Sequence, residues 1–262
     1  MSHLWPSARL RRRWLRAFRR AAPSVQIISG VVALAALWAT ANGIYQVIRK
    51  PTELFFPVSG TLYKVPSETW DAYGSLFRKH ATNVISAELL AALAQVEASG
   101  NPIARTYWRW SWRTDPFELY RPASSAVGMY QITDGTFEEA KRYCVHNHVV
   151  ALDGPWHAWR SCWFNGFYFR VVPSHAVELT SAYLDRGVSR ALARYRIRTA
   201  TLAQKQNMAA LIHLCGVGAG NIYARRGLGS TGDLRCGDHG ARDYVARVDA
   251  MKRMFAALAA QE

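Results

Sequence analysis

A glutamate at the end of an apolar segment is the residue of this chain best suited to do chemistry. Glu97 closes a stretch in which Leu90, Leu93 and Val96 recur at helical spacing. A carboxyl group among apolar side chains loses hydration, which disfavours its charged form. A carboxyl group that keeps its proton can act as a general acid, and breaking a glycosidic bond requires one.

A second short element follows about 30 residues later, in the stretch 124–133. Gly128 permits a turn that other residues resist, and Gln131 supplies an amide for hydrogen bonding. Each element is weak by itself, because a glutamate near a helix end is commonly solvated and Gly-x-x-Gln is frequent by chance. Their order, with a Ser-Gly-Asn-Pro bend closely following Glu97, makes the combination informative.

Together these elements resemble the soluble lytic transglycosylase (SLT) family, which has a goose-lysozyme-like fold. The family's first motif, Glu-Ser-x-x-Asn-Pro, corresponds to Glu-Ala-Ser-Gly-Asn-Pro at 97–102. Its second, Gly-Leu-Met-Gln, corresponds to Gly-Met-Tyr-Gln at 128–131, with Ser-Ala before it and Thr-Phe after it. The stretch 242–248, Arg-Asp-Tyr-Val-Ala-Arg-Val, is similar to the family's closing helix. The resemblance covers roughly residues 80–255.

Two departures from the family pattern concern the site. Ala98 stands where the family has serine, and 213–220 reads His-Leu-Cys-Gly-Val-Gly-Ala-Gly where the family has Ala-Tyr-Asn-Ala-Gly. The glycines are kept, but the tyrosine and asparagine are not. A lone histidine on a helix is more often structural than functional, so His213 is not predicted to be a site residue.

The resemblance implies a mechanism with one carboxyl group. Protonated Glu97 would donate to the oxygen that joins N-acetylmuramic acid to N-acetylglucosamine. As a carboxylate it would then take the proton of the muramyl C6 hydroxyl, which attacks C1 and leaves a 1,6-anhydro end. No water enters, so a second carboxylate is not needed, and no cofactor or metal is expected. The residues expected to bind the glycan or line its cleft are Ser125, Gly128, Met129, Tyr130, Gln131 and Tyr244.

Two alternatives to a transglycosylase remain open. A hydrolytic muramidase on the same fold would want a partner acid, for which Asp115, Glu118 and Asp134 are candidates by position alone. A catalytically weak peptidoglycan-binding or scaffold subunit of an envelope-spanning apparatus is favoured by Ala98 and by the altered third motif. Glycan strands of peptidoglycan are the expected partner in all three cases.

The charge of the chain is concentrated at its N-terminus. The net charge is +15, yet residues 1–50 carry nine basic and no acidic side chains, and the remainder has only +6. No recognisable nucleic-acid module accompanies the basic residues, so nucleic-acid binding is not predicted.

The uncharged stretch 25–48 predicts a transmembrane signal anchor. Its 24 residues would span about 36 Å as a helix, enough for a hydrocarbon core of about 30 Å. Seven arginines precede it and Arg49 and Lys50 follow it, which predicts a cytoplasmic N-terminus. We therefore expect a single-pass protein of the bacterial inner membrane with a periplasmic catalytic domain. A signal peptide cleaved near Ala39-Thr40-Ala41 is the alternative.

All four cysteines lie after the apolar stretch, on the oxidising side of a bacterial membrane. Three pairings are possible. The nearest-neighbour pairing, Cys144 with Cys162 and Cys215 with Cys236, closes short loops and is the one expected. Zinc binding near Cys144 is disfavoured, because the cysteine spacing is too wide for a typical ligand pair.

The periodicity predicts a mainly α protein: a lysozyme-like helical domain with long aromatic loops, preceded by one transmembrane helix. Expected helices cover 69–80, 87–98 with Ser86 as N-cap, 136–142, 173–186, 188–197, 201–214 and 241–260. The organisation expected is a basic tail at 1–24, the anchor at 25–48, a linker and leading helix at 49–80 and the lysozyme-like domain at 81–262.

Two stretches break the helical pattern. Residues 103–122 suggest a loop or ragged hairpin, and 144–169 a long aromatic loop. Trp108, Trp110 and Trp112 alternate with other residues, so they could form a sugar-stacking platform or cover the core beneath a loop.

Overall fold

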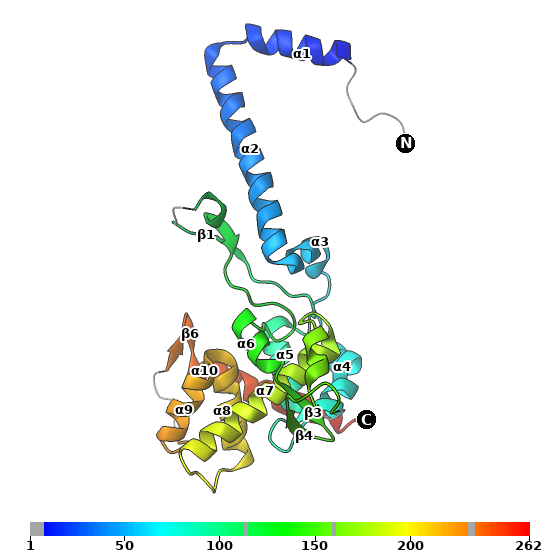
Figure 1. The fold of residues 1–262 in the computed structure, drawn as a ribbon, viewed down its shortest axis with the longest axis vertical. Coiled ribbons are helices and arrows are strands. Elements are labelled where there is room, and N and C mark those ends of the chain that lie inside the picture. Colours follow the sequence, from blue (N-terminus) through cyan, green and yellow to red (C-terminus); the bar gives the residue numbers. More distant parts are fainter. Residues whose placement is uncertain (1–7, 113–114, 159–160, 230–233) are drawn as a thin grey trace. The chain divides into compact units, whose positions relative to one another are not determined.

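The structure, a computed structural model, describes residues 8–112, 115–158, 161–229 and 234–262. It is mainly helical with a few short strands (Figure 1). The chain forms two compact units. The first contains residues 1–51 and 108–121, and the second contains 52–107 and 122–262.

The first unit combines two helices with a short hairpin. The helices are α1 (Ala8–Arg20) and α2 (Pro23–Arg49); the hairpin consists of β1 (Trp108–Trp110), the 3₁₀ turn η2 (Pro116–Glu118) and β2 (Tyr120–Pro122). The hairpin expected within 103–122 is confirmed. Helix α2 is long and apolar enough to cross a membrane, and only 6% of its most apolar window is buried. It therefore has the properties of a membrane span or a signal sequence and not those of a core helix.

The second unit is a helical domain. After η1 (Pro51–Phe55) and α3 (Phe56–Ser59), its helices are α4 (Pro66–His80), α5 (Ala87–Ala98), α6 (Asp134–Ala140), α7 (Pro173–Arg194), α8 (Leu202–Cys215), α9 (Val217–Arg225) and α10 (Ala241–Ala259). Two antiparallel pairs, β3 (Tyr143–His146) with β4 (Val149–Leu152) and β5 (Arg235–Cys236) with β6 (His239–Gly240), and the 3₁₀ helix η3 (Trp163–Phe167) complete it.

Helix α5 is the buried centre of this domain. The Ser86 hydroxyl caps it by accepting a hydrogen bond from the Leu89 N–H, as expected. Every residue from Leu89 to Ala94 is buried, and α4, α7 and α10 all contact the helix. A helix that is apolar on all sides is stable only when neighbouring elements cover every side and remove its apolar surface from water. The apolar stripe expected from the sequence is therefore one side of a helix that is buried on all sides between Leu89 and Ala94.

The observed elements differ from the expected ones at three places. Helix α7 runs unbroken through Gly187, where two helices were expected. A Cβ at Gly187 would lie 3.1 Å from the Ile212 side chain, so the glycine permits close packing with α8 and does not end the helix. The glycine-rich α9 was missed, and the stretch 144–169 contains the β3–β4 hairpin instead of being a loop throughout. Helix α4, the leading helix expected within 49–80, packs on α5 and α7.

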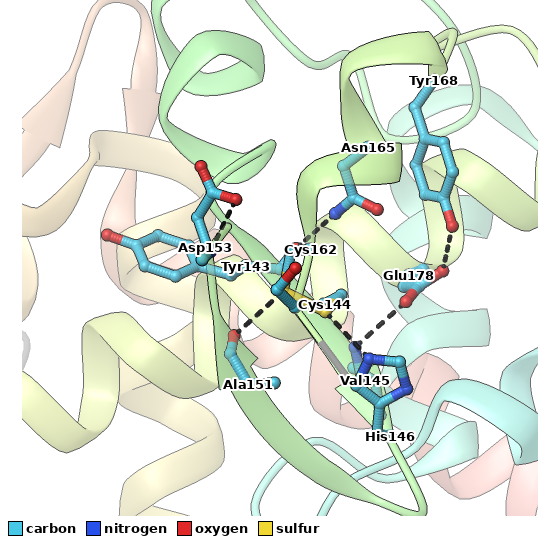
Figure 2. Close-up of a disulfide and its surroundings, with 12 residues drawn as sticks. Tyr143, Cys144, Val145, His146, Ala151, Asp153, Cys162, Asn165, Tyr168 and Glu178 are labelled. Carbon is cyan, nitrogen blue, oxygen red and sulfur yellow. Dashed lines mark hydrogen bonds between the residues drawn. A yellow bond between two sulfur atoms is a disulfide. The ribbon is translucent and has the colours of Figure 1, made fainter. Parts of the chain in front are cut away.

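Both expected disulfides are confirmed: Cys144 pairs with Cys162, and Cys215 with Cys236. Figure 2 shows the first of them beside a buried carboxylate. Glu178 accepts hydrogen bonds from the Val145 N–H at 3.0 Å and from the Tyr168 hydroxyl at 2.8 Å. The disulfide joins β3 to the aromatic segment that follows the hairpin. Glu178 connects both of these to α7 through its two hydrogen bonds.

Replacing both Cys144 and Cys162 by alanine should lower the free energy of unfolding by about 3 kcal/mol, because the enclosed segment regains conformational freedom in the unfolded chain. Chemical denaturation of the full chain in detergent would measure this loss. The exposed substitution Ser189→Ala on α7 is the control and should change stability by less than about 0.5 kcal/mol. An unchanged denaturation midpoint in the double variant would show that the bridge does not stabilise the fold.

Candidate active site

Glu97 lies in the last turn of α5, where the helix ends in a left-handed bend. Ser99 and Gly100 have φ angles of 48° and 65°. A Cβ at Gly100 would lie 2.3 Å from the Thr69 hydroxyl oxygen, so a larger residue would clash as well as adopt a strained backbone. The glycine of the Ser-Gly-Asn-Pro bend is therefore required by α4, which passes next to it.

Asn101 fixes the chain after the bend. It is fully buried; its Nδ2 donates to the Ser59 carbonyl at 2.5 Å, and its Oδ1 accepts from the Ile103 N–H at 3.0 Å. A buried amide with satisfied donor and acceptor is costly to displace. The bend thus holds the C-terminal turn of α5, and with it the position of Glu97.

Two side chains from two other helices meet Glu97. The Tyr244 hydroxyl, from α10, donates to Glu97 Oε1 at 2.5 Å. His213, from α8, places Nδ1 3.1 Å from the Tyr244 oxygen and 3.6 Å from Glu97 Oε1. The Glu97 side chain is 19% exposed and that of His213 is 10% exposed. The site is therefore a carboxylate at the edge of the core, with a tyrosine and a histidine next to the same carboxylate oxygen.

Burial controls the protonation of the two supporting groups. Desolvation lowers the pKa of His213, while the Glu97 charge and a hydrogen bond with the Tyr130 backbone act in the opposite direction. Burial raises the pKa of Tyr244 well above its usual value, and the adjacent Glu97 charge raises it further. Near neutral pH the imidazole is thus neutral and the phenol keeps its proton.

This arrangement can serve Glu97 in either of its protonation states. When Glu97 is ionised, Tyr244 donates to it and His213 Nδ1–H donates to the Tyr244 oxygen. When Glu97 is protonated at Oε2, Oε1 remains an acceptor for the same Tyr244 hydroxyl. The carboxyl group can therefore give up and regain a proton while its partners stay in place.

The second predicted element forms a tight turn stabilised by Arg170. Gly128 has φ +82°, and a Cβ there would lie 2.5 Å from the Arg170 carbonyl oxygen. Gln131 Nε2 donates to the Gly128 carbonyl at 2.9 Å and to the Ala104 carbonyl at 3.3 Å. The Arg170 guanidinium donates to the carbonyls of Ser125 and Ile132. Gln131 and Arg170 thus act on the backbone of the turn.

The other residues of this element take different places. The Ser125 hydroxyl accepts from the Asp134 N–H, and Met129 is fully buried in the core. Tyr130 is also buried, and burial raises its pKa well above the usual value. Its hydroxyl has no hydrogen-bond partner among the described residues.

A cavity of about 280 Å³ adjoins the carboxylate cluster. Residues that line it include Tyr130, Gln131, Thr136, Thr180, Tyr183 and His213. Its volume is just below the range of small-ligand sites, roughly 300–1,000 Å³. His213 lines the cavity and also approaches Glu97, so one side chain contacts both the cavity and the carboxylate.

The three acids considered for a hydrolytic mechanism have other partners. Asp115 and Glu118 belong to the first unit, where Asp115 caps η2 and Glu118 pairs with Arg49. Asp134 pairs with Arg170 at 2.7 Å. Within the described part of the second unit, Asp134 is not bonded to Glu97.

The tryptophans of the hairpin pack within the first unit. Trp108 and Trp110 both contact the Tyr120 ring, and Trp110 also stacks on Trp38 of α2 at a ring distance of 6.0 Å. Trp112 is fully exposed. The alternation seen in the sequence thus directs two indoles toward one tyrosine.

Sequence reasoning missed His213 and Arg170. His213 occupies the altered third motif, and its helical position opposite Glu97 could be inferred only with the packing of α8 known. Arg170 lies about 40 residues after the turn that it stabilises, and no local pattern marks it. The predicted members Glu97 and Tyr244 are brought together, and Gln131 lies along the adjoining cavity.

Comparisons with models of protein families, with curated proteins and with solved structures find no match to this chain. Within the described residues, no group of three or more His, Cys, Asp or Glu side chains is arranged to hold a metal ion. The chemistry of the site must therefore be inferred from its own geometry.

The coupling between Glu97 and His213 can be measured by NMR titration of the imidazole. Replacing Glu97 by glutamine removes the charge that favours the imidazolium, so the pKa of His213 should fall further below its usual value. The titration of His175, whose pKa is lowered by burial, should stay the same and serves as the control. An unchanged His213 titration would contradict the proximity of the two groups.

Proposed function

We propose that this protein is a membrane-anchored lytic transglycosylase that cleaves the β-1,4 bond between N-acetylmuramic acid and N-acetylglucosamine in peptidoglycan. The observation that carries the proposal is the Glu97–Tyr244–His213 cluster at the edge of a helical core. The lysozyme-like fold and the peptidoglycan substrate are part of the proposal and rest on the motif resemblance.

In the proposed reaction, one carboxyl group does both proton transfers. Glu97 donates its proton to the glycosidic oxygen as the bond to C1 breaks. The resulting carboxylate then takes the proton of the muramyl C6 hydroxyl while that oxygen bonds to C1. Tyr244 and His213 both approach Oε1, so Oε2 would be the atom that faces the glycan. The reaction ends with Glu97 protonated again, and no water is consumed.

The supporting groups suit an acid that must become a base. A fixed donor such as lysine would favour only the carboxylate form. The Tyr244–His213 pair is neutral, so Oε1 can accept the same hydrogen bond whether Oε2 carries a proton or not, and the pair supports both halves of the cycle. The altered third motif is then compatible with activity, because His213 supplies a polar partner for the cluster.

The adjoining cavity supports a role in glycan binding. Polar side chains line it, among them Gln131, Thr136 and His213. A sugar hydroxyl or acetamido group bound there would meet hydrogen-bonding groups.

The proposed location is the bacterial inner membrane, with the N-terminus in the cytoplasm and the second unit in the periplasm. Support comes from the apolar α2, the arginines of α1 that precede it, and the two disulfides. Positive residues before a span favour the cytoplasmic side, and disulfides persist in oxidising compartments.

Mass spectrometry of peptidoglycan digested with the full chain in detergent tests the proposal. We expect anhydro-muropeptides from the wild type, and about 10²–10⁴-fold less from Glu97→Gln, because the amide cannot transfer the proton. Glu88→Gln, a matched change on the same helix, should leave product formation unchanged.

Each other outcome identifies a different function. Reducing ends in place of anhydro ends would identify a hydrolytic muramidase. Binding to peptidoglycan with no cleavage would identify a scaffold subunit. Undiminished product formation by Glu97→Gln would exclude Glu97 as the catalytic acid.

A further inference from the structure

The hairpin of the first unit packs along one face of the last part of α2. Three side chains of that face donate to hairpin carbonyl oxygens: Trp38 to Pro116 at 3.1 Å, Asn42 to Tyr120 at 2.7 Å and Gln46 to Phe117 at 2.6 Å. Ring contacts join Trp38 to Trp110 and Tyr45 to Phe117, and Arg49 pairs with Glu118. The positions 38, 42, 45, 46 and 49 follow the helical repeat, so they form one continuous stripe.

The hairpin divides α2 into a bare part and a covered part. Before Trp38 the apolar side chains are largely exposed, for example Ile27 at 67% and Leu34 at 68%. Beyond it, Asn42 and Gln46 are only 2% and 5% exposed. The hairpin thus covers the two amide side chains of this later part, while Ile44 and Ile48 of the same part remain 58% and 72% exposed.

The lengths of these parts match the layers of a bilayer. The stretch 23–41 contains 19 residues and would span about 28 Å, close to a hydrocarbon core of about 30 Å. The following eight residues of α2 would extend about 12 Å farther, through the headgroup layer. If 23–41 fills the hydrocarbon, the stacked Trp38 and Trp110 lie at its boundary, where indole rings accumulate in membrane proteins.

The exposed surface of the hairpin fits the same layer. Trp110 is 65% exposed and Trp112 is fully exposed, and Arg109 between the strand tryptophans is exposed as well. Indoles with an adjacent guanidinium suit the headgroup region, which offers apolar chains, carbonyls and phosphates together. Asp115 and Glu118 carry charges that are costly in hydrocarbon, so the hairpin is not expected at the centre of the bilayer.

Resting on the proposed membrane anchoring of α2, we propose that the hairpin segments 108–112 and 115–121 lie in the outer headgroup layer of the membrane, with Trp110 and Trp112 against lipid. The hairpin would act as a second membrane contact and fix the rotation of the span beneath it. Its lipid ligand is the headgroup and upper acyl region of phosphatidylglycerol- and phosphatidylethanolamine-type lipids. A protein partner for the same tryptophans is the alternative that the experiment must distinguish.

Spin labels on three single substitutions of the full chain test this placement in phosphatidylethanolamine–phosphatidylglycerol liposomes. Trp112→Cys reports on the hairpin, Leu34→Cys on the middle of α2, and Ala193→Cys on an exposed position at the end of α7. Collisions are measured with oxygen, with a water-soluble nickel complex and with nickel chelated on lipid headgroups.

The expected result is strong collision of the Trp112→Cys label with headgroup nickel and several-fold weaker collision with soluble nickel than at Ala193→Cys. The Leu34→Cys label should meet oxygen and neither form of nickel. If Trp112→Cys is as open to soluble nickel as Ala193→Cys while Leu34→Cys is deep, the hairpin proposal is wrong and the anchor proposal stands. Shielding of Trp112→Cys from both nickel probes and from oxygen would identify a protein contact and overturn the hairpin proposal, and shielding from nickel with strong oxygen collision would place the label in the hydrocarbon and overturn it too. Strong collision of the Leu34→Cys label with soluble nickel would overturn the proposal that α2 is a membrane anchor.

A paired variant tests the cause of the placement. Asn42→Leu with Gln46→Leu removes two donors to hairpin carbonyls, so a Trp112→Cys label on that background should become several-fold more open to soluble nickel. Thr40→Leu is the matched control, because Thr40 bonds to the Ala36 carbonyl of its own helix. Unchanged accessibility in the double variant would show that α2 does not hold the hairpin at the membrane.

Discussion

The enclosure of α5 is the constraint on which the helical domain depends. Six consecutive residues of this helix, from Leu89 to Ala94, are buried, so neighbours must cover it on all sides. Its C-terminal turn comes to the edge of that enclosure, and Glu97 is the first acidic group there. A carboxylate in such a position requires polar partners from the covering helices, because burial without them is costly. Tyr244 of α10 and His213 of α8 supply those partners.

The same principle organises the first unit. Asn42 and Gln46 would be unfavourable on an otherwise apolar helix facing lipid. The hairpin covers them and offers carbonyl oxygens that would otherwise need water. In both units, polar groups on an apolar helix are matched by segments distant in sequence. One pairing supports a proposed chemical step, and the other supports a proposed attachment to lipid.

Much of the fold could be predicted, because its signals are local. The apolar period and the Ser86 cap defined α5 to the residue, and the short cysteine loops indicated the pairing that is observed. Errors arose where a glycine had two interpretations. Gly187 was taken as a break, whereas it permits α7 to approach Ile212 closely. Gly220 of α9 has the same role, so this glycine-rich segment, for which no helix was expected, is helical.

The sequence by itself determined the helical class, the apolar N-terminal helix and the candidacy of Glu97, and it favoured the cysteine pairing that is observed. These follow from residue types and short spacings, which act through local backbone preference and burial. Only the tertiary structure decided that His213 joins Tyr244 at Glu97, that Arg170 stabilises the Gly128 turn, and that the tryptophan hairpin packs on α2. Those contacts join residues from about 30 to 80 positions apart in sequence, and up to 147 for Tyr244 and Glu97. No local pattern specifies such pairs, because their free energy arises only when the helices and hairpins are packed together.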